Sequence, residues 1–328
     1  MTTADHRVAV LCGGVGAARF LRGLLEVVTD RDVTGIVNVG DDSDVHGLHV
    51  SPDLDTITYT LADAVNADAG WGLVGETWNA MGQLRAYAAA AGVEPTDEAA
   101  GWFSLGDRDL GTHLYRSSRL RAGASLSDVT AEIVRSWGLG LSLVPVTDDR
   151  VRTRVTLGDG RDLSFQEYFV REQHAVSVRS VRFDGVADAR PSSAVEPALG
   201  SADVIVIAPS NPIVSIQPVL DVPGVRAAVE ARRDRTVAIS PIVGGAALKG
   251  PADRLMSELG LEPTAVGVAR WYAPLASTLV IDSVDADLAP AVQAEGIRCV
   301  VTDTIMSRPG VGASLATACL HAVSGAPR

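Results

Sequence analysis

The alternation of short apolar runs with helical patterns most constrains the fold of this chain. Residues 7–12, RVAVLC, form a valine-rich run that stops at Gly13, as a buried parallel strand does. A helical pattern follows in AARFLRGLLEVV, and VTGIVNVG supplies a second strand. These segments predict one βαβ unit.

The same alternation returns in the C-terminal part, where helical patterns separate the runs ADVIVIAP, TVAISPIV, STLVIDS and RCVVTDT. This order predicts an α/β fold, with a Rossmann-like, doubly wound and mainly parallel sheet. The middle of the chain differs, because three amphipathic helical patterns precede several strand-like pieces. We expect a nucleotide-binding core over 1–61 plus 196–328, and an inserted smaller helical and β subdomain over 62–195 that completes the substrate site.

Composition excludes several classes of partner. The chain has 28 Lys plus Arg against 40 Asp plus Glu, a formal net charge of −12, which argues against nucleic acid or an anionic membrane surface. No apolar run is long enough to span a membrane, and the N-terminus lacks the pattern of a signal peptide, so we expect a cytoplasmic protein. The three cysteines show no metal-ligand spacing and indicate free, reduced thiols.

The segment GGVGAARF joins the first strand to the first helix. Backbone N–H groups of Gly13, Gly14 and Gly16 can converge on an anion, and the helix N-terminus favours negative charge. Arg19 stands where the third glycine of a dinucleotide fingerprint would be, and it could bind a diphosphate with two hydrogen bonds. A tight βα turn without a ligand is the alternative interpretation.

The stretch NVGDDSDVHGLHVSPDLDTITYTL places five aspartates near the end of the second strand. The dipeptide SP before Asp53 predicts a helix start, so Asp53 complements the helix dipole. Asp55 lies about 200° around that helix from Asp53, so the two are not expected to bind one metal ion. We predict that Asp55, with Asp41 or Asp42, binds Mg²⁺, whereas solvated loop acids are the alternative. Three neighbours remain open as ligand contacts or loop residues: Asn38, His46 and His49.

The segment LGDRDLGTHLYRSSRLRAG contains a third group of candidates. Asp109 is predicted to cap a helix on which His113, Arg116 and Arg119 recur every three residues and form a cationic ridge. A solvated helix face would show the same pattern. Arg108, between two acids in a glycine-led turn, is the better candidate for a site residue.

Two later loops follow predicted strands, at the edge where parallel sheets bind ligands. The first, APSNPIVSI, offers Ser210, Asn211 and Pro212, and the second, SPIVGGAALKGPAD, offers Gly244 and the only lysine, Lys249. Side by side, these loops would form a nucleotide pocket. The chain has no CxxC, HExxH or GxSxG, which excludes common zinc sites and the hydrolase elbow.

Taken together, GGVGAARF, NVGDD, PDLDT, GDRD, PSNP, SPIVGG and KGPAD resemble the 2-phospho-L-lactate transferases of deazaflavin coenzyme F420 biosynthesis. Within that family, the chain is most similar to actinobacterial members that use phosphoenolpyruvate. The resemblance spans essentially the whole chain. Ala17 and Gln217 depart from glycines that are usual in that version, which puts substrate detail in doubt more than activity.

The resemblance implies a magnesium-dependent homodimer with two small-molecule substrates, a GDP-activated three-carbon acid and the deazariboflavin FO. The ribityl hydroxyl of FO would attack the phosphorus that carries the acid and release GMP. Asp55 with Asp41 or Asp42 would serve the metal and FO, and Arg108 would contact FO or phosphate. The residues from Gly13 to Gly16 and from Ser210 to Pro212 would hold the nucleotide. Independently of the resemblance, Asn38 and His113 are further candidate substrate contacts.

Two other classes of protein compete with this interpretation. A dinucleotide-dependent oxidoreductase would explain the opening βαβ unit, but it requires a glycine fingerprint that is missing here. The gluconeogenesis factor group, regulators that bind nucleotide sugars, shares the early glycine loop but fits GDRD and KGPAD less well. The sequence leaves open whether phosphoenolpyruvate or 2-phospho-L-lactate is transferred, and which aspartate, if any, is the base.

Overall fold

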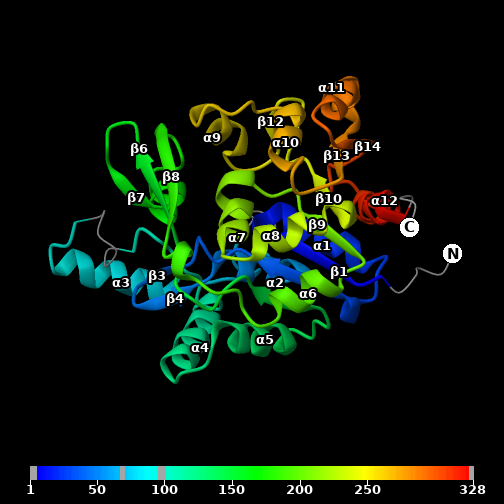
Figure 1. Cartoon of the computed structure of the whole chain (residues 1–328). Helices are drawn as coiled ribbons and strands as arrows, with labels where there is room; N and C mark the ends of the chain where they lie inside the picture. The colour runs from blue at the N-terminus through cyan, green and yellow to red at the C-terminus, as the bar shows by residue number, and fades with distance from the viewer. Residues whose placement is uncertain (1–5, 67–70, 95–100, 325–328) are drawn as a thin grey trace.

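The computed structural model describes residues 6–66, 71–94 and 101–324. A parallel seven-stranded sheet forms the centre of the molecule (Figure 1). Its strands, in spatial order, are β14 (Arg298–Thr302), β13 (Thr278–Asp282), β10 (Thr236–Ile239), β9 (Val204–Ile207), β1 (Val8–Cys12), β2 (Val33–Val37) and β5 (Ser142–Pro145). The predicted α/β fold with a doubly wound parallel sheet is therefore confirmed.

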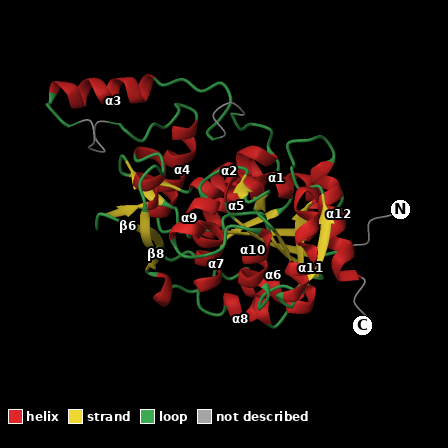
Figure 2. Ribbon diagram, turned by 90° about the horizontal axis from the view of Figure 1, so that it is seen from above, coloured by secondary structure: helices red, strands yellow, loops and turns green. Residues whose placement is uncertain are grey.

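Helices cover both faces of this sheet (Figure 2). The first face carries α1 (Gly14–Leu25), α2 (Pro52–Leu61) and α12 (Val311–Ser324), and α1 packs against both of the others. The opposite face carries α6 (Val195–Ser201), α8 (Val225–Glu230), α10 (Ala265–Tyr272) and α11 (Ala289–Ala294). Two further short helices are α7 (Gln217–Asp221) and α9 (Ala252–Glu258).

The central strands are apolar throughout because helices bury both of their faces. All five residues of β1 and all four of β9 are buried. β1 pairs in parallel with β2 on one side and with β9 on the other, so Val8 lies opposite both Val33 and Val204. The first strand therefore lies inside the sheet, with the residues that follow it at the centre of one edge.

The middle of the chain forms smaller units around this core. They comprise the hairpin of β3 (Ser43–Val45) and β4 (Leu48–Val50), the helices α3 (Asn79–Ala90), α4 (Asp109–Arg121) and α5 (Leu126–Ser136), and a sheet of β6 (Arg152–Leu157), β7 (Asp162–Ser164) and β8 (Val178–Asp184). A hairpin of β11 (Ile242–Val243) and β12 (Ala246–Ala247) follows β10. In both views α3 lies at the periphery of the molecule (Figures 1 and 2).

The range 62–195, expected to be an insertion, also includes β5. This strand pairs in parallel with β2, where Ile36 lies opposite Val144, and it is the edge strand of the main sheet. The main sheet therefore draws on residues from within the expected insertion. Among the described residues, no helix has the length and apolar character needed to cross a membrane.

Candidate functional site

The carboxyl ends of β1, β2 and β9 bring three predicted segments together. Gly13 follows β1, Asn38 follows β2, and Ser210 lies just after β9. The chain adds strands to one side of β1 first and to the other side later, so the topological switch point lies between β1 and β9. Ligands of open α/β sheets bind in the crevice at such a point.

Asp53 reaches from the first turn of α2 into the glycine loop. Its Oδ1 accepts the backbone N–H of Gly14 at 2.8 Å, and its Oδ2 accepts Nδ2 of Asn38 at 2.9 Å. A Cβ atom at position 13 would stand 2.6 Å from Oδ2 of Asp53, so only glycine allows this approach. The N–H of Gly14, predicted to bind phosphate, is thus already bonded to a carboxylate.

The PSNP loop packs directly onto the glycine loop. The Ser210 hydroxyl donates to the carbonyl oxygen of Gly13 at 2.7 Å. A Cβ at Gly16 would lie 2.2 Å from the carbonyl oxygen of Pro209, so this glycine is needed for the close approach of two backbones. Asn211 caps the π-helical segment Pro212–Ile216, because its Oδ1 accepts the N–H of Ile213 at 2.9 Å.

Asp41 and Asp42 are buried beside this junction. Oδ2 of Asp42 accepts the Ser51 hydroxyl at 2.8 Å and lies 2.9 Å from Nε2 of His49. Within the described residues, Oδ1 of Asp41 and Oδ1 of Asp42 are buried without a hydrogen-bond partner. One oxygen of each carboxylate is therefore buried without a hydrogen bond, although the side chains of Asn38 and Thr153 lie close enough to Asp41 to lower its pKa in part.

The negative charges of residues 38–55, which we call the acidic loop, act on one another. Burial, and then the charge of Asp53, raise the pKa of Asp41 well above its usual range. Burial also raises the pKa of Asp53 to about 6, although Asn38 and the N–H of Gly14 oppose the rise. The loop thus holds more buried negative charge than its own donors stabilise.

These free oxygens are suited to Mg²⁺, which takes one or two protein carboxylates and completes its shell with water and substrate phosphate oxygens. Within the described residues, no group of three or more His, Cys, Asp or Glu side chains is placed to hold a metal ion alone. A site built from two carboxylates and a bound diphosphate is compatible with that arrangement.

Asp55, predicted to bind the metal, has a different partner. Both of its carboxylate oxygens accept hydrogen bonds from the guanidinium of Arg116, with Nη1 at 3.0 Å from Oδ2. Asp53 and Asp55 point to opposite sides of α2, as their spacing predicts, but Asp53 faces the glycine loop. In the predicted metal pair, Asp41 has a free oxygen and Asp55 has none.

The buried face of α4 also differs from the sequence-based expectation. His113 and Arg116 are fully buried against α2 and β4, so the predicted cationic ridge does not exist. Arg119 instead pairs with Glu132 through Nη2 at 2.7 Å. Asp109 does not cap α4, because its Oδ1 accepts the Tyr59 hydroxyl at 2.7 Å and it is the first helical residue.

Within the described parts of the chain, four other predicted residues make no hydrogen bond or ion pair with the glycine loop, the acidic loop or the PSNP loop. Arg108 is exposed, and its guanidinium binds the carbonyl of Val74. Gly244 donates its N–H to Asp285, and Lys249 is exposed just after the β11–β12 hairpin. Arg19 is half-buried on α1.

Sequence reasoning did not identify several contacts of the acidic loop. Gln166 Nε2 donates to the carbonyl of Asp41 at 3.1 Å, and the N–H of Thr153 donates to the carbonyl of Gly40 at 2.6 Å. Both residues are more than 100 positions away in sequence, and nothing local marks them. The SP dipeptide placed Asp53 in the first turn of α2, but nothing in the sequence indicated its bonds to Gly14 and Asn38.

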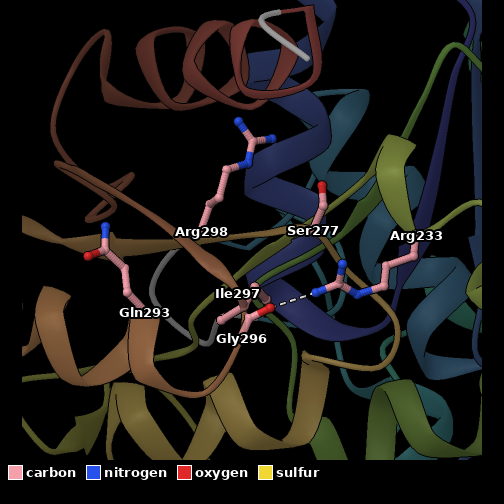
Figure 3. Close-up of a pocket in the computed structure, with 6 residues that line it drawn as sticks. All are labelled: Arg233, Ser277, Gln293, Gly296, Ile297 and Arg298. Atoms are coloured by element: carbon pink, nitrogen blue, oxygen red, sulfur yellow. Dashed lines mark hydrogen bonds between the residues drawn. The ribbon is translucent and has the colours of Figure 1, made fainter. Parts of the chain in front are cut away.

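A shallow depression of about 410 Å³ lies elsewhere (Figure 3). Its lining residues are Arg233, Ser277, Gln293, Gly296, Ile297 and Arg298, which precede or begin β10, β13 and β14. It therefore lies at the amino ends of these strands, opposite the edge that carries the acidic loop. Arg233 donates to the Gly296 carbonyl at 2.7 Å and Arg298 to the Ala322 carbonyl at 2.6 Å, so both guanidinium groups serve local packing.

Comparison with known proteins gives consistent matches over the whole chain. Residues 8–316 match the family model described as 2-phospho-L-lactate transferase CofD. A protein named phosphoenolpyruvate transferase from Streptomyces griseus is 43% identical, over 96% of this chain and 98% of its own length. Another of that name from Mycolicibacterium smegmatis is 38% identical, over 95% of this chain and 97% of its own length. A crystal structure of a UPF0052 family protein from Bacillus halodurans has a TM-score of 0.59 at 17% identity, over 96% of this chain and 99% of that one.

Proposed function

Since this chain belongs to the 2-phospho-L-lactate transferase CofD family, we propose that it transfers a phosphoenolpyruvyl or 2-phospho-L-lactyl group to FO in coenzyme F420 biosynthesis. The donor is the GDP-activated acid. An oxygen of the FO ribityl group forms a bond to the phosphorus that carries the acid, the bond from that phosphorus to GMP breaks, and GMP leaves. The hydroxyl proton passes to a carboxylate of the acidic loop.

One structural observation supports this proposal in addition to family membership. Asp41 and Asp42, which follow β2 at the carboxyl edge of the sheet, each keep a buried, unpartnered oxygen near the strands where we expect a diphosphate to bind. We assign Mg²⁺ to these two residues, in place of Asp41 with Asp55. The ion, when bound, neutralises charge on the diphosphate, which phosphoryl transfer needs more than a nucleophilic side chain.

The chain's own residues supply the rest of the site. Ser210 and Asn211 order the backbone that faces the glycine loop, and the hydroxyl of Ser51 fixes Asp42 in place. The names of the relatives favour phosphoenolpyruvate as the transferred acid. The catalytic roles of Asp42 and Arg108, the homodimer and the cytoplasmic location stay predictions.

An aromatic surface next to the acidic loop supports a planar acceptor such as FO. Phe165 stacks on Phe169 with ring centroids 5.5 Å apart and planes 22° apart, and Phe169 is 37% exposed. Gln166, between them in sequence, donates to the carbonyl of Asp41. The Phe169 ring also packs against His174, with ring centroids 5.3 Å apart, and we propose that FO stacks on its exposed part.

The test measures binding and turnover separately. FO fluorescence reports binding to the purified protein with and without Mg²⁺ and GDP, and mass spectrometry reports the product formed from each activated acid. We expect binding and product from wild type, at least 100-fold less product from Asp41→Asn, and weaker FO binding by Phe169→Ala. Asp234→Asn, an exposed acid at the other end of the sheet, is the control and should equal wild type. Absence of FO binding under every condition would reject the proposed function.

A further inference from the structure

We propose that Arg116 is a positioning residue of the transfer reaction. Through Asp55 it holds the first turn of α2, so that Asp53 stays on the glycine loop. This inference rests on the proposed function for its catalytic consequence, but its structural part stands on contacts within the described chain.

Arg116 is only 1% exposed and is the largest completely buried side chain among the described residues. Its two terminal nitrogens bind both oxygens of Asp55, which offsets much of the cost of burying the charge, whereas its Nε has no hydrogen-bond partner in the described chain. Apolar side chains of similar volume would pack α2 against α4 as well or better. What the planar guanidinium adds is direction, because a bidentate bond fixes the orientation of the carboxylate.

A second attachment makes the junction of α2 and α4 rigid. One turn beyond Asp55 on α2, the Tyr59 hydroxyl donates to Oδ1 of Asp109 and lies 2.7 Å from the Thr112 hydroxyl oxygen. His113 fills the space between the two attachments, with Nε2 at 3.2 Å from Asp109 and Nδ1 at 3.8 Å from Asp55. The first turn of α2 therefore cannot rotate without breaking buried polar contacts.

Rotation of that turn would change the candidate active site, because a short series of hydrogen bonds connects the two. Asp53 is two residues from Asp55, on the opposite side of the helix, and holds Gly14 and Asn38. Oδ1 of Asn38 in turn accepts the N–H of Gly40 at 2.8 Å, next to Asp41. Loss of the Arg116 bond would let Asp53 leave the Gly14 N–H and would displace the backbone that carries Asp41.

The experiment compares Arg116→Met and Arg116→Lys with Arg119→Met, which removes an exposed-side ion pair on the same helix. Transfer is assayed well below the melting temperature of each variant, and the Gly14 amide resonance is followed by NMR. For Arg116→Met we expect kcat to fall about 100-fold, as misplacement by about 1 Å can do, with little change in KM. The Gly14 amide resonance should shift, Arg116→Lys should recover part of both effects, and Arg119→Met should show neither.

A double variant tests whether Arg116 acts through Asp55. The double variant Asp55→Leu with Arg116→Met should have a kcat no lower than that of the worse single variant, because each change removes the same pair of hydrogen bonds between Arg116 and Asp55. Wild-type kcat and an unshifted Gly14 resonance in folded Arg116→Met would overturn the proposal. If Arg116→Met does not fold, Arg116→Lys decides by the same two readouts. If wild type shows no transfer, the proposed function fails, while the Gly14 resonance still decides whether Arg116 holds Asp53.

Discussion

At the scale of single residues, the acidic loop is defined by carboxylates that have too few partners. Asp53 is bonded twice and still keeps a raised pKa, because burial outweighs its two donors. Asp41 has a free oxygen and a pKa raised further by the charge of Asp53. Such an arrangement lowers stability, and it is expected where a ligand or cation supplies the missing positive charge.

The raised pKa of Asp53 predicts how stability depends on pH. The folded protein binds a proton at Asp53 with a pKa of about 6 against a usual 3.8, so it binds protons more tightly than the unfolded chain. The free energy of unfolding should therefore fall as pH rises from about 4 to about 6.5, with a contribution from Asp53 of up to about 3 kcal/mol.

Asp53→Asn should remove that contribution. Urea unfolding of both proteins in EDTA, at several pH values across this window, measures the difference between the two curves. Parallel curves would contradict the assignment of a buried, charged Asp53. Asp30→Asn, the same change at an exposed residue of a short 3-10 helix, should show the same dependence of stability on pH as wild type.

Sequence patterns predicted which segments lie together better than they predicted the hydrogen bonds of those segments. The glycine loop, Asn38, Asp41, Asp42 and the PSNP loop were predicted as candidates, because parallel strands end in the same crevice. The partner of Asp55 was not predicted, since Arg116 lies 61 positions away and helical spacing alone indicated a solvated face. Burial of an arginine depends on what packs over it, which local sequence does not contain.

At the scale of elements, close contacts between backbones hold the first βα unit. α1 packs on α12 at Gly23, where a Cβ atom would stand 2.3 Å from the carbonyl carbon of Gly312. Such helix contacts need glycine on at least one side, since any side chain would separate the axes. The position of α1, and with it the glycine loop, depends on this contact.

Gly23→Ala should therefore destabilise the protein, by about 1–3 kcal/mol as overpacking does, although alanine is the better helix former. Gly200→Ala in α6 is the matched control, because that position is exposed and a Cβ there meets nothing within 4 Å. The control should gain up to about 1 kcal/mol. Thermal unfolding followed by circular dichroism measures both, and equal melting temperatures would show that α1 and α12 can separate without cost.

Hydrophobic periodicity predicted the types of the elements, but not the bonds that side chains make at the starts of helices. Apolar runs predicted β1, β2, β9, β10 and β13, because buried parallel strands have to be apolar on both faces. The edge strand β14 was also predicted from an apolar run, although none of its residues is buried. Ser51 occupies the N-cap position of α2, as the SP dipeptide predicts, but its hydroxyl binds Asp42 rather than the helix. Asp109, predicted as a cap, is the first helical residue of α4 and binds Tyr59. A tertiary partner competed with the helix terminus for the same oxygen, and only the fold brings that partner close.

At the scale of the whole molecule, the periphery carries apolar side chains that the fold leaves uncovered. Trp71 and Trp78 pack edge to face at 6.2 Å ahead of α3, and both are exposed together with Val74 and Tyr87. Clusters of exposed aromatic residues are typical of interaction surfaces. This surface is where we expect the second copy of the predicted homodimer to bind.

Light scattering during gel filtration tests that expectation. Wild type should elute with twice the 34.1 kDa mass of one chain. Trp78→Ser should shift the mass toward that of a monomer, since it removes a large apolar contact. Val284→Ser, at an exposed apolar residue in the 3-10 helix after β13, should remain dimeric. A monomeric wild type at all concentrations would contradict the prediction.

The place of β1 between β2 and β9 also sets a constraint on the order of events during synthesis. Val8 needs Val204 as a neighbour, and α1 needs Gly312 near the end of the chain. Until those later segments have been synthesised, β1 lacks one of its two neighbouring strands and α1 lacks a helix that packs on it. Nascent chains of this protein should need chaperones that shield apolar surface, and truncation before α12 should leave an N-terminal part that aggregates.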